Sequence, residues 1–313
     1  MAYAYEGTRT FEELGAYSDF STVASVYMEQ VQIVTLDPNI KTVADLAGKR
    51  VSIGAPNSGV YFNAVDVLGA YDLTEDDIEA TYEDFGTSAD SLKDGKIDAA
   101  FVVAGAPTTA ITSLATTKDV YLVSLDDEHI NKLLETSPYY SKNVISADTY
   151  DMDADATTVA VVATVIARND VSDEDVYNFL FGIFENVDSI TAAHAKGAEL
   201  SIEAAASVKG VPYHPGAAKY FEEKGFKVDA VKEGAGNGTA SALSFGTGGE
   251  SGTYYAFGGV LASFVSGKSD CKVTALTSGG SQANVEDLTN GNVQLAFVQS
   301  DVMNYAYNGQ IGR

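Results

Sequence analysis

The sequence predicts an α/β fold, and three observations support this prediction. Short runs rich in Val, Ile and Phe alternate with stretches in which apolar residues recur every three or four positions. This alternation is typical of βαβ units and a mainly parallel sheet. The length of 313 residues fits two domains, and glycine-rich turns follow several of the expected strands. We therefore expect two α/β lobes with a cleft between them.

The expected strands are short and apolar. They cover residues 31–36, 50–55, 98–103, 120–125, 158–167, 242–247, 271–277 and 293–299. Helical periodicity is clearest between them at 60–71, 255–267 and 285–291. The segment 231–242 breaks the alternation, because it is rich in Gly and small polar residues and has no apolar face. Its composition predicts a flexible linker, with a long surface loop as the alternative.

Charge and composition exclude several functions. The net charge of −25 disfavours binding to nucleic acid or to anionic lipid. One cysteine, Cys271, allows no internal disulfide, and three scattered histidines without a Cys/His cluster argue against zinc. The acidic run 151–156 resembles the start of a calcium loop, but Ala156 and Val162 stand where that loop needs Gly and Glu. We expect no metal and no cofactor.

The sequence contains no segment that could span a membrane. Its longest uncharged apolar stretch is 158–167, whereas a helix needs ~20 residues to cross the bilayer. No basic segment followed by an apolar one stands at the N-terminus, as a secretion signal would require. Either the protein is cytoplasmic or its native signal is missing from this chain.

Five loops at the carboxyl ends of expected strands could carry the function. They are 55–63, 104–108, 246–254, 278–282 and 299–301. Open α/β sheets bind ligands at this edge. The stretch 243–265 contains no Lys or Arg, yet its glycines precede a helix start near Ser251–Thr253. The N–H groups of a helix N-terminus can hold an anion without a basic side chain.

Enzyme signatures are incomplete in these loops. The dinucleotide fingerprint has Gly246 and Gly248 but Ser251 in its third position, and a nucleophile elbow would need Gly where Thr253 stands. Ser251 could be the nucleophile of a hydrolase, but nothing in the sequence indicates which histidine would act as its general base. A surface helix start explains His129, and a cap or core-edge role explains His214. We expect no catalytic residue.

The chain resembles the TAXI-type solute-binding proteins of tripartite (TRAP) transporters. The resemblance lies in LSFGTGGESGTYYAFGG, LTSGGSQANVEDLTNG, LAFVQSDVMNYAYNG, VQIVTLDPNIKTVADLAGKRVSIGAPNSGVYFNA, LKDGKIDAAFVVAGAPTTAI and VPYHPGAAKYFEEKG. It covers nearly the whole chain outside 231–242. It implies a type II periplasmic-binding-protein-like fold, in which a sheet flanked by helices forms each lobe and the ligand cleft lies between the lobes.

The order of these segments differs from that of the family. The segment at 214–225 belongs near the family's C-terminus and the strand at 243 near its N-terminus, yet here they are joined through 231–242. In addition, AYAYEG (2–7) nearly repeats NYAYNG (304–309). Both features predict a circular permutant, engineered by joining the old termini and opening the chain at a Tyr-rich helix. Either copy could then occupy the native position, and their competition would allow a domain swap in an otherwise monomeric protein.

The resemblance also implies the domains and the site. Lobe I would combine 1–41 with 157–313, lobe II would be 42–156, and the crossings near 35–41 and 155–159 would act as hinges. Glu29 would either meet a ligand ammonium group or make a structural hydrogen bond. The implied ligand-binding residues are Glu29, Ser58, Gly59, Asn63, Ala104, Gly105, Ala106, Thr247, Ser251, Gly252, Thr253, Tyr254, Ser278 and Gln299.

The implied function is extracytoplasmic binding of a small carboxylate, most readily glutamate or glutamine, for the membrane subunits of a TRAP transporter. The protein itself would lie in the periplasm or at the cell surface, without entering the membrane. Two alternatives remain open: an engineered sensor or folding scaffold with lost or altered binding, and an α/β hydrolase.

Overall fold

The computed structural model describes residues 16–231 and 242–308. The expected linker at 231–242 lies almost entirely outside the described residues, and so does the first Tyr-rich copy at 2–7. The second copy lies in the last described helix, where Asn304, Tyr305 and Ala306 are buried. None of the described helices is long and apolar enough to cross a membrane.

The structure is an α/β fold, as the sequence predicts. Its strands are β1 (Phe20–Thr35), β2 (Arg50–Ser52), β3 (Glu79–Thr81), β4 (Ala99–Ala104), β5 (Tyr121–Leu122), β6 (Ser141–Ile145), β7 (Ala156–Arg168), β8 (Leu243–Gly246), β9 (Val273–Leu276) and β10 (Leu295–Gln299). Its α-helices are α2 (Val60–Ala70), α3 (Phe85–Lys93), α4 (Thr109–Ala115), α5 (Asp127–Thr136), α6 (Asp173–Phe184), α7 (Val187–Ala193), α8 (Ile202–Ala205), α9 (Pro215–Glu223), α10 (Thr253–Lys268), α11 (Ser281–Thr289) and α12 (Ser300–Asn308).

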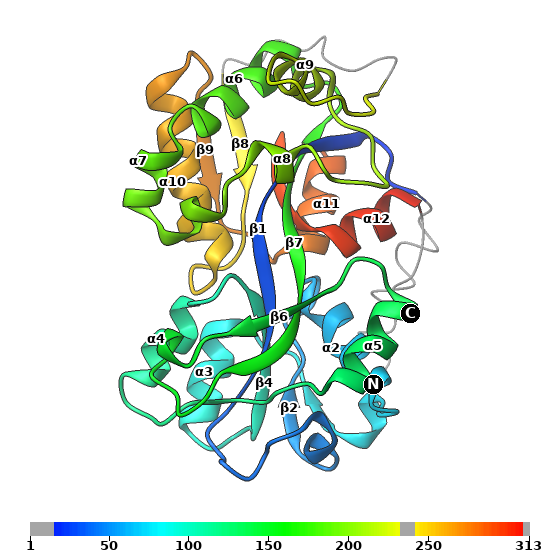
Figure 1. The fold of residues 1–313 in the computed structure, drawn as a ribbon, viewed down its shortest axis with the longest axis vertical. Coiled ribbons are helices and arrows are strands. Elements are labelled where there is room, and N and C mark those ends of the chain that lie inside the picture. The colour runs from blue at the N-terminus through cyan, green and yellow to red at the C-terminus, as the bar shows by residue number, and fades with distance from the viewer. Residues whose placement is uncertain (1–15, 232–241, 309–313) are drawn as a thin grey trace.

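Two long strands connect the two halves of the molecule. The strands form one sheet in the order β3-β2-β4-β1-β7-β10-β8-β9, to which β5 and β6 are added at β1 and β7. Figure 1 shows β1 and β7 side by side, running from the half with β2, β4 and α2–α5 to the half with β8, β9 and α6–α12. Because both strands belong to both halves, they are the natural place for a hinge.

The point where the strands pass between the halves can be read from their pairing. Strand β1 pairs with β7 from Phe20 to Gln30 and with β4 from Gln30 to Thr35. Strand β7 pairs with β6 over 156–160 and with β10 over 163–167. The crossing therefore lies near Gln30 and 160–163, and the expected crossings at 35–41 and 155–159 are misplaced.

The expectation of a mainly parallel sheet is only partly right. Strands β2, β3 and β4 pair in parallel, as do β8, β9 and β10. By contrast, β1 and β7 are antiparallel to every named strand that they pair with. The alternation of strands and helices reveals the βαβ units, but it carries no information on the direction of strands that connect two such units.

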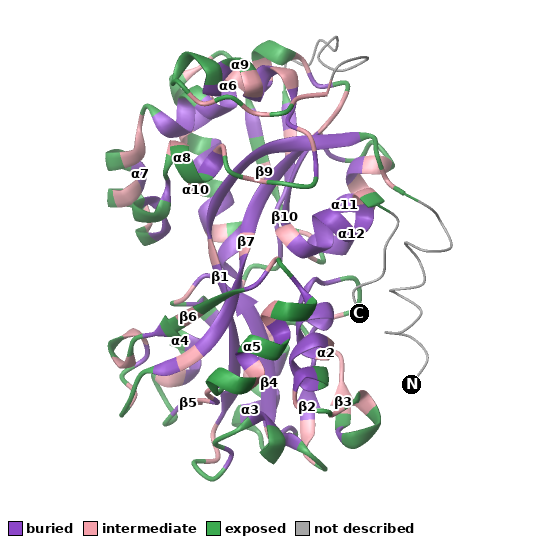
Figure 2. Cartoon of the chain, turned by 45° about the vertical axis from the view of Figure 1, so that its right-hand side comes forward, coloured by how far each residue is buried: buried purple, intermediate pink, exposed green. Residues whose placement is uncertain are grey.

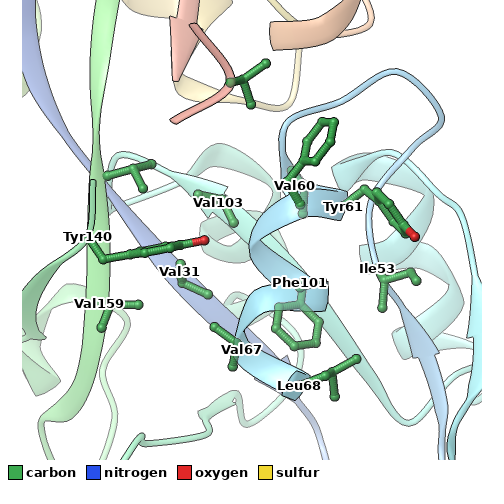
Figure 3. Packing of buried hydrophobic residues seen from close by; sticks show 14 of the residues in the cluster. Val31, Ile53, Val60, Tyr61, Val67, Leu68, Phe101, Val103, Tyr140 and Val159 are labelled. Carbon is green, nitrogen blue, oxygen red and sulfur yellow. The ribbon is translucent and has the colours of Figure 1, made fainter. Parts of the chain in front are cut away.

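The core follows the division into halves only in part. One apolar cluster packs α6, α9 and α10 against β8 and β10. Another extends from α2 and β4 through β1 and β7 to α11 and α12, and Figure 3 shows its centre around Val31, Phe101 and Val159. Figure 2 shows the result: the central strands are buried almost throughout, whereas the helices keep exposed outer faces.

Candidate functional site

A cavity of about 470 Å³ lies between the two halves. It is lined by the loops that follow β2, β3, β8 and β9, by the carboxyl ends of β4 and β10, and by the middle of β1. The lining residues are Glu29, Ala55, Ser58, Gly59, Val60, Asp84, Phe85, Val103, Ala104, Gly248, Gly249, Glu250, Ser251, Gly252, Thr253, Tyr254, Ser278, Gly279, Gly280, Ser281 and Gln299. This volume is in the range of small-ligand pockets, ~300–1,000 Å³.

Three helices begin at the cavity with a glycine N-cap. They are α2 after Gly59, α10 after Gly252 and α11 after Gly280, and none of these has a side-chain cap hydrogen bond. At several other helices a side chain supplies the cap, as Asp126 does for α5 and Ser172 for α6. A side-chain cap uses first-turn N–H groups and occupies the space in front of them. Without it, the partial positive charge of the helix N-terminus is offered to an anion in the cavity.

Glu29 places a carboxyl group in the wall at the point where β1 passes between the halves. It is only 2% exposed, and its Oε2 accepts a hydrogen bond from the Tyr254 hydroxyl at 2.7 Å. Burial raises the pKa of Glu29 to about 8; the bond from Tyr254 opposes the rise, and Asp301 adds to it. The Tyr254 ring stacks on Phe297 at 4.7 Å, which fixes the hydroxyl in this position.

Gln299 is held in the wall by a hydrogen-bond network that joins the halves. Its Nε2 donates to Asn63 Oδ1 at 2.8 Å. Asn63 Nδ2 in turn donates to Asp301 Oδ2 at 2.9 Å and to the Tyr140 hydroxyl at 2.8 Å. The remaining Gln299 atom, Oε1, is buried and has no hydrogen-bond partner among the described residues. The wall thus contains a buried acceptor that lacks a donor.

Hydrogen bonds to backbone carbonyls join the two halves around the cavity. The Thr253 hydroxyl donates to the Gly105 carbonyl at 2.8 Å. The backbone N–H of Ala110 donates to the carbonyl of Ser251 at 3.2 Å, and that of Ala283 to the carbonyl of Asn57 at 3.0 Å. The structure therefore has its two halves in contact.

Ten of the fourteen residues expected to bind ligand line the cavity: Glu29, Ser58, Gly59, Ala104, Ser251, Gly252, Thr253, Tyr254, Ser278 and Gln299. The other four lie behind it. Asn63 supports Gln299, and Thr247 donates to the Leu276 carbonyl at 2.6 Å, joining the ends of β8 and β9. Gly105 accepts from Thr253, and the Ala106 N–H donates to Gln30 Oε1 at 3.0 Å.

Sequence reasoning missed Asp84 and Phe85 altogether, and it named the loops of Glu250 and Ser281 without naming these two residues. Asp84 and Phe85 follow β3, which is three residues long, has no buried residue and was not expected as a strand. Its parallel pairing with β2 makes 82–85 another loop at the same edge of the sheet. Ser281 Oγ accepts from the Gln299 backbone N–H at 3.1 Å.

The histidines lie away from the cavity. His129 stacks on Tyr71 at 3.7 Å near the start of α5, and His214 caps α9, as expected for both. His194 caps the 3₁₀ helix Ala195–Glu199. None of the three lines the cavity that contains Ser251. Within 16–231 and 242–308, no three His, Cys, Asp or Glu residues form a group that could hold a metal ion.

Three solved structures illustrate the proteins to which this fold is similar. The periplasmic aliphatic sulphonate binding protein SsuA from Escherichia coli is 16% identical, with a TM-score of 0.31, over 62% of this chain and 51% of that one. An amino acid ABC transporter substrate-binding protein from Streptococcus pneumoniae, bound to L-arginine, is 19% identical, with a TM-score of 0.25 and coverage of 46% and 47%. A glutathione-bound periplasmic binding protein from Brucella ovis is 10% identical, with a TM-score of 0.32 and coverage of 56% and 49%.

The chain spans about half the length of these proteins. A longer match comes from the sequence family. Residues 1–225 and 245–311, which together make up most of the chain, match the NMT1-like family. The protein therefore belongs to the NMT1-like family.

Proposed function

We propose that this protein is an extracytoplasmic solute-binding protein, without catalytic activity, that holds a small amino acid in the cavity between its halves. The observation that carries the proposal is the convergence of three glycine-capped helix N-termini with Glu29 and Gln299 on one cavity. The helix N-termini suit a ligand carboxylate. The carboxyl of Glu29 suits an ammonium group, and the free acceptor of Gln299 suits an N–H donor. Glutamate and glutamine have this combination of groups.

We further propose that the protein serves a TRAP transporter of the TAXI type. The support is the resemblance of LSFGTGGESGTYYAFGG, LTSGGSQANVEDLTNG and LAFVQSDVMNYAYNG, whose loops all reach the cavity wall. Residues from about 31 to 160 would form one lobe and the rest of the chain the other. The lobes would close on the ligand by bending β1 and β7 near Gln30 and 160–163.

The permuted order of segments is part of this proposal. The family match leaves out 226–244, which contains the glycine-rich segment between the two matched stretches. The Tyr17 N–H donates to the Ala306 carbonyl at 2.9 Å, and the rings of Phe20 and Tyr307 meet edge to face at 5.6 Å. Residues 17–20 and 306–307 thus lie side by side. A chain joined at this point and opened within 231–242 could therefore adopt the same fold with little rearrangement.

Calorimetric titration tests the proposed function. Protein freed of ligand by unfolding and refolding is titrated with glutamate, glutamine, aspartate, 2-oxoglutarate and succinate. We expect one-to-one binding without turnover, weakened by joint replacement Ser251→Ala and Ser278→Ala. Ser263→Ala is the control, because Ser263 is exposed on the same helix, α10, outside the cavity. Absence of binding by a cooperatively melting protein, in both this and the re-ordered chain, would refute the proposal.

A further inference from the structure

We infer that the cavity is a charge filter: it accepts an amino acid with an uncharged, hydrogen-bonding side chain, such as glutamine, and rejects dicarboxylates such as glutamate and 2-oxoglutarate. This inference rests on the proposed function and selects among its ligands. It is carried by the charges of the wall, by the number of places that can hold an anion and by the acceptors that face the ligand.

Every charged side chain in the cavity wall is acidic. Glu29, Asp84 and Glu250 line the cavity, and among the described residues no Lys, Arg or His does. Elsewhere in the protein some carboxylates are paired with cations, as the half-buried Asp98 is with Arg50 at 2.6 Å. A second ligand carboxylate would therefore meet the like charges of Asp84 and Glu250 without a cation to offset them.

The nearest buried cation is already used. Lys196 is 5% exposed, does not line the cavity, and its Nζ is bonded to Glu199 Oε1 at 2.6 Å. A Cβ placed on Gly105 would lie 2.5 Å from Lys196 Cε, so the Gly105 backbone is packed directly against the lysine stem. Lys196 thus acts within the wall, where its charge offsets those of Glu199 and Glu29, and it is not free to bind a ligand.

The anion-binding capacity of the wall comes from backbone N–H groups and uncharged hydroxyls, such as those of Ser251 and Ser278, without a basic side chain. The glycine-capped N-termini of α2, α10 and α11 supply the N–H groups, two of which are already engaged. Gly252 N–H donates to the Gly249 carbonyl, and Ala283 N–H donates to Asn57. The partial charge of helix N-termini is equivalent to about half a unit each, which suits the one carboxylate that every amino acid carries.

The amide of Gln299 offers the ligand an acceptor. Burial raises the pKa of Asp301 to about 6, which still leaves its carboxylate ionised at neutral pH. This carboxylate accepts a hydrogen bond from Asn63 Nδ2 and so orients the Asn63 amide. Asn63 Oδ1 then fixes the donating side of Gln299, which leaves Gln299 Oε1 to accept. A ligand ammonium or amide N–H satisfies this oxygen, whereas a ligand carboxylate oxygen is repelled by it.

The test compares ligands of one shape. Glutamine and glutamate differ in one terminal group, and glutaramate is glutamine without its ammonium group. At pH 7 we expect calorimetry to show glutamine binding on the order of 100-fold more tightly than glutamate, with 2-oxoglutarate weaker still. Glu29→Gln should weaken glutamine at least about tenfold while leaving glutaramate unchanged, because the bound ammonium group favours the ionised form of Glu29 and only this group loses its partner.

The outcomes separate the two proposals. Tighter binding of glutamate or 2-oxoglutarate than of glutamine would overturn the charge filter and leave the solute-binding function intact. Failure of every compound to bind would overturn both. Tyr254→Phe removes the hydrogen bond to Glu29 and should lower glutamine affinity, whereas the exposed neighbour Tyr255→Phe should not. Equal affinities of these two variants would count against the role of Glu29, and their melting temperatures show whether each is folded.

Discussion

Replacement of Gly59 by Ala should prevent the two halves from closing. Gly59 is the N-cap of α2, with φ −72° and ψ −19°, a conformation that alanine adopts without strain. The added Cβ would lie 1.5 Å from Gln299 Oε1 and 2.6 Å from Gln299 Cδ, and Gln299 belongs to the opposite half. Contacts below 3.0 Å are essentially never seen for real Cβ atoms. Either Gln299 swings away or the halves move apart.

The size of the effect follows from what Gln299 would lose. A shift of about 1.5 Å or more breaks its 2.8 Å bond to Asn63 Oδ1. Losing a buried hydrogen bond and leaving its partner unsatisfied costs ~1–3 kcal/mol. If that cost is borne only in the closed, ligand-bound form, affinity falls about 5- to 150-fold. Gly69→Ala is the matched control on the same helix, because no atom lies within 4 Å of its added Cβ. It should raise stability by ~0.5–1 kcal/mol and leave affinity unchanged.

The assay combines calorimetric affinity for the bound amino acid with small-angle scattering at saturating ligand. Gly59→Ala should bind more weakly and show a larger radius of gyration than Gly69→Ala. The double variant Gly59→Ala, Gln299→Ala should bind no worse than Gln299→Ala alone, since the obstacle has been removed. Wild-type affinity together with an unchanged radius for Gly59→Ala would refute the view that this contact forms on closure.

Three further outcomes are expected. The pKa of Glu29 is about 8 in the folded protein against 4.5 for the free side chain, so between these pH values the folded protein keeps a proton that the unfolded chain releases. The stability of the ligand-free protein should therefore fall as pH rises from 4.5 to 8 and level off above pH 8. Melting temperatures measured across this range should show a smaller decline for Glu29→Gln. Phe297→Ala, at a fully buried ring, should cost ~3–5 kcal/mol in urea unfolding. His214→Ala removes the Gly216 cap and the bond to the Val171 carbonyl, so it should cost ~1–3 kcal/mol of stability while leaving calorimetric affinity unchanged.

The sequence predicts the short parallel strands well, except β3, because they lie in short runs rich in apolar residues. It misses the first half of β1, where Ser21, Thr22, Ser25, Glu29 and Gln30 interrupt the apolar pattern although all five are buried. A local pattern cannot reveal that a polar side chain is buried, since its partners come from elsewhere in the chain. Ser25, for example, donates to the carbonyl of Ala204.

The site likewise has a part that the sequence predicts and a part that it does not. Loops at strand ends can be found from sequence because parallel strands present their carboxyl ends at one edge, and these loops supply most of the wall. The side chains behind the wall, such as Asn63 and Lys196, are set by the packing of one half on the other, which no sequence spacing encodes.

The N-caps of the helices at the cavity can be recognised in the sequence. The three helices that offer their N-termini to the cavity begin after Gly59, Gly252 and Gly280. A glycine at an N-cap forgoes the hydrogen bond that Asp, Ser or His supplies to other helices of this chain. That loss is compensated only if something else meets the N–H groups, and at a cavity the ligand can do so.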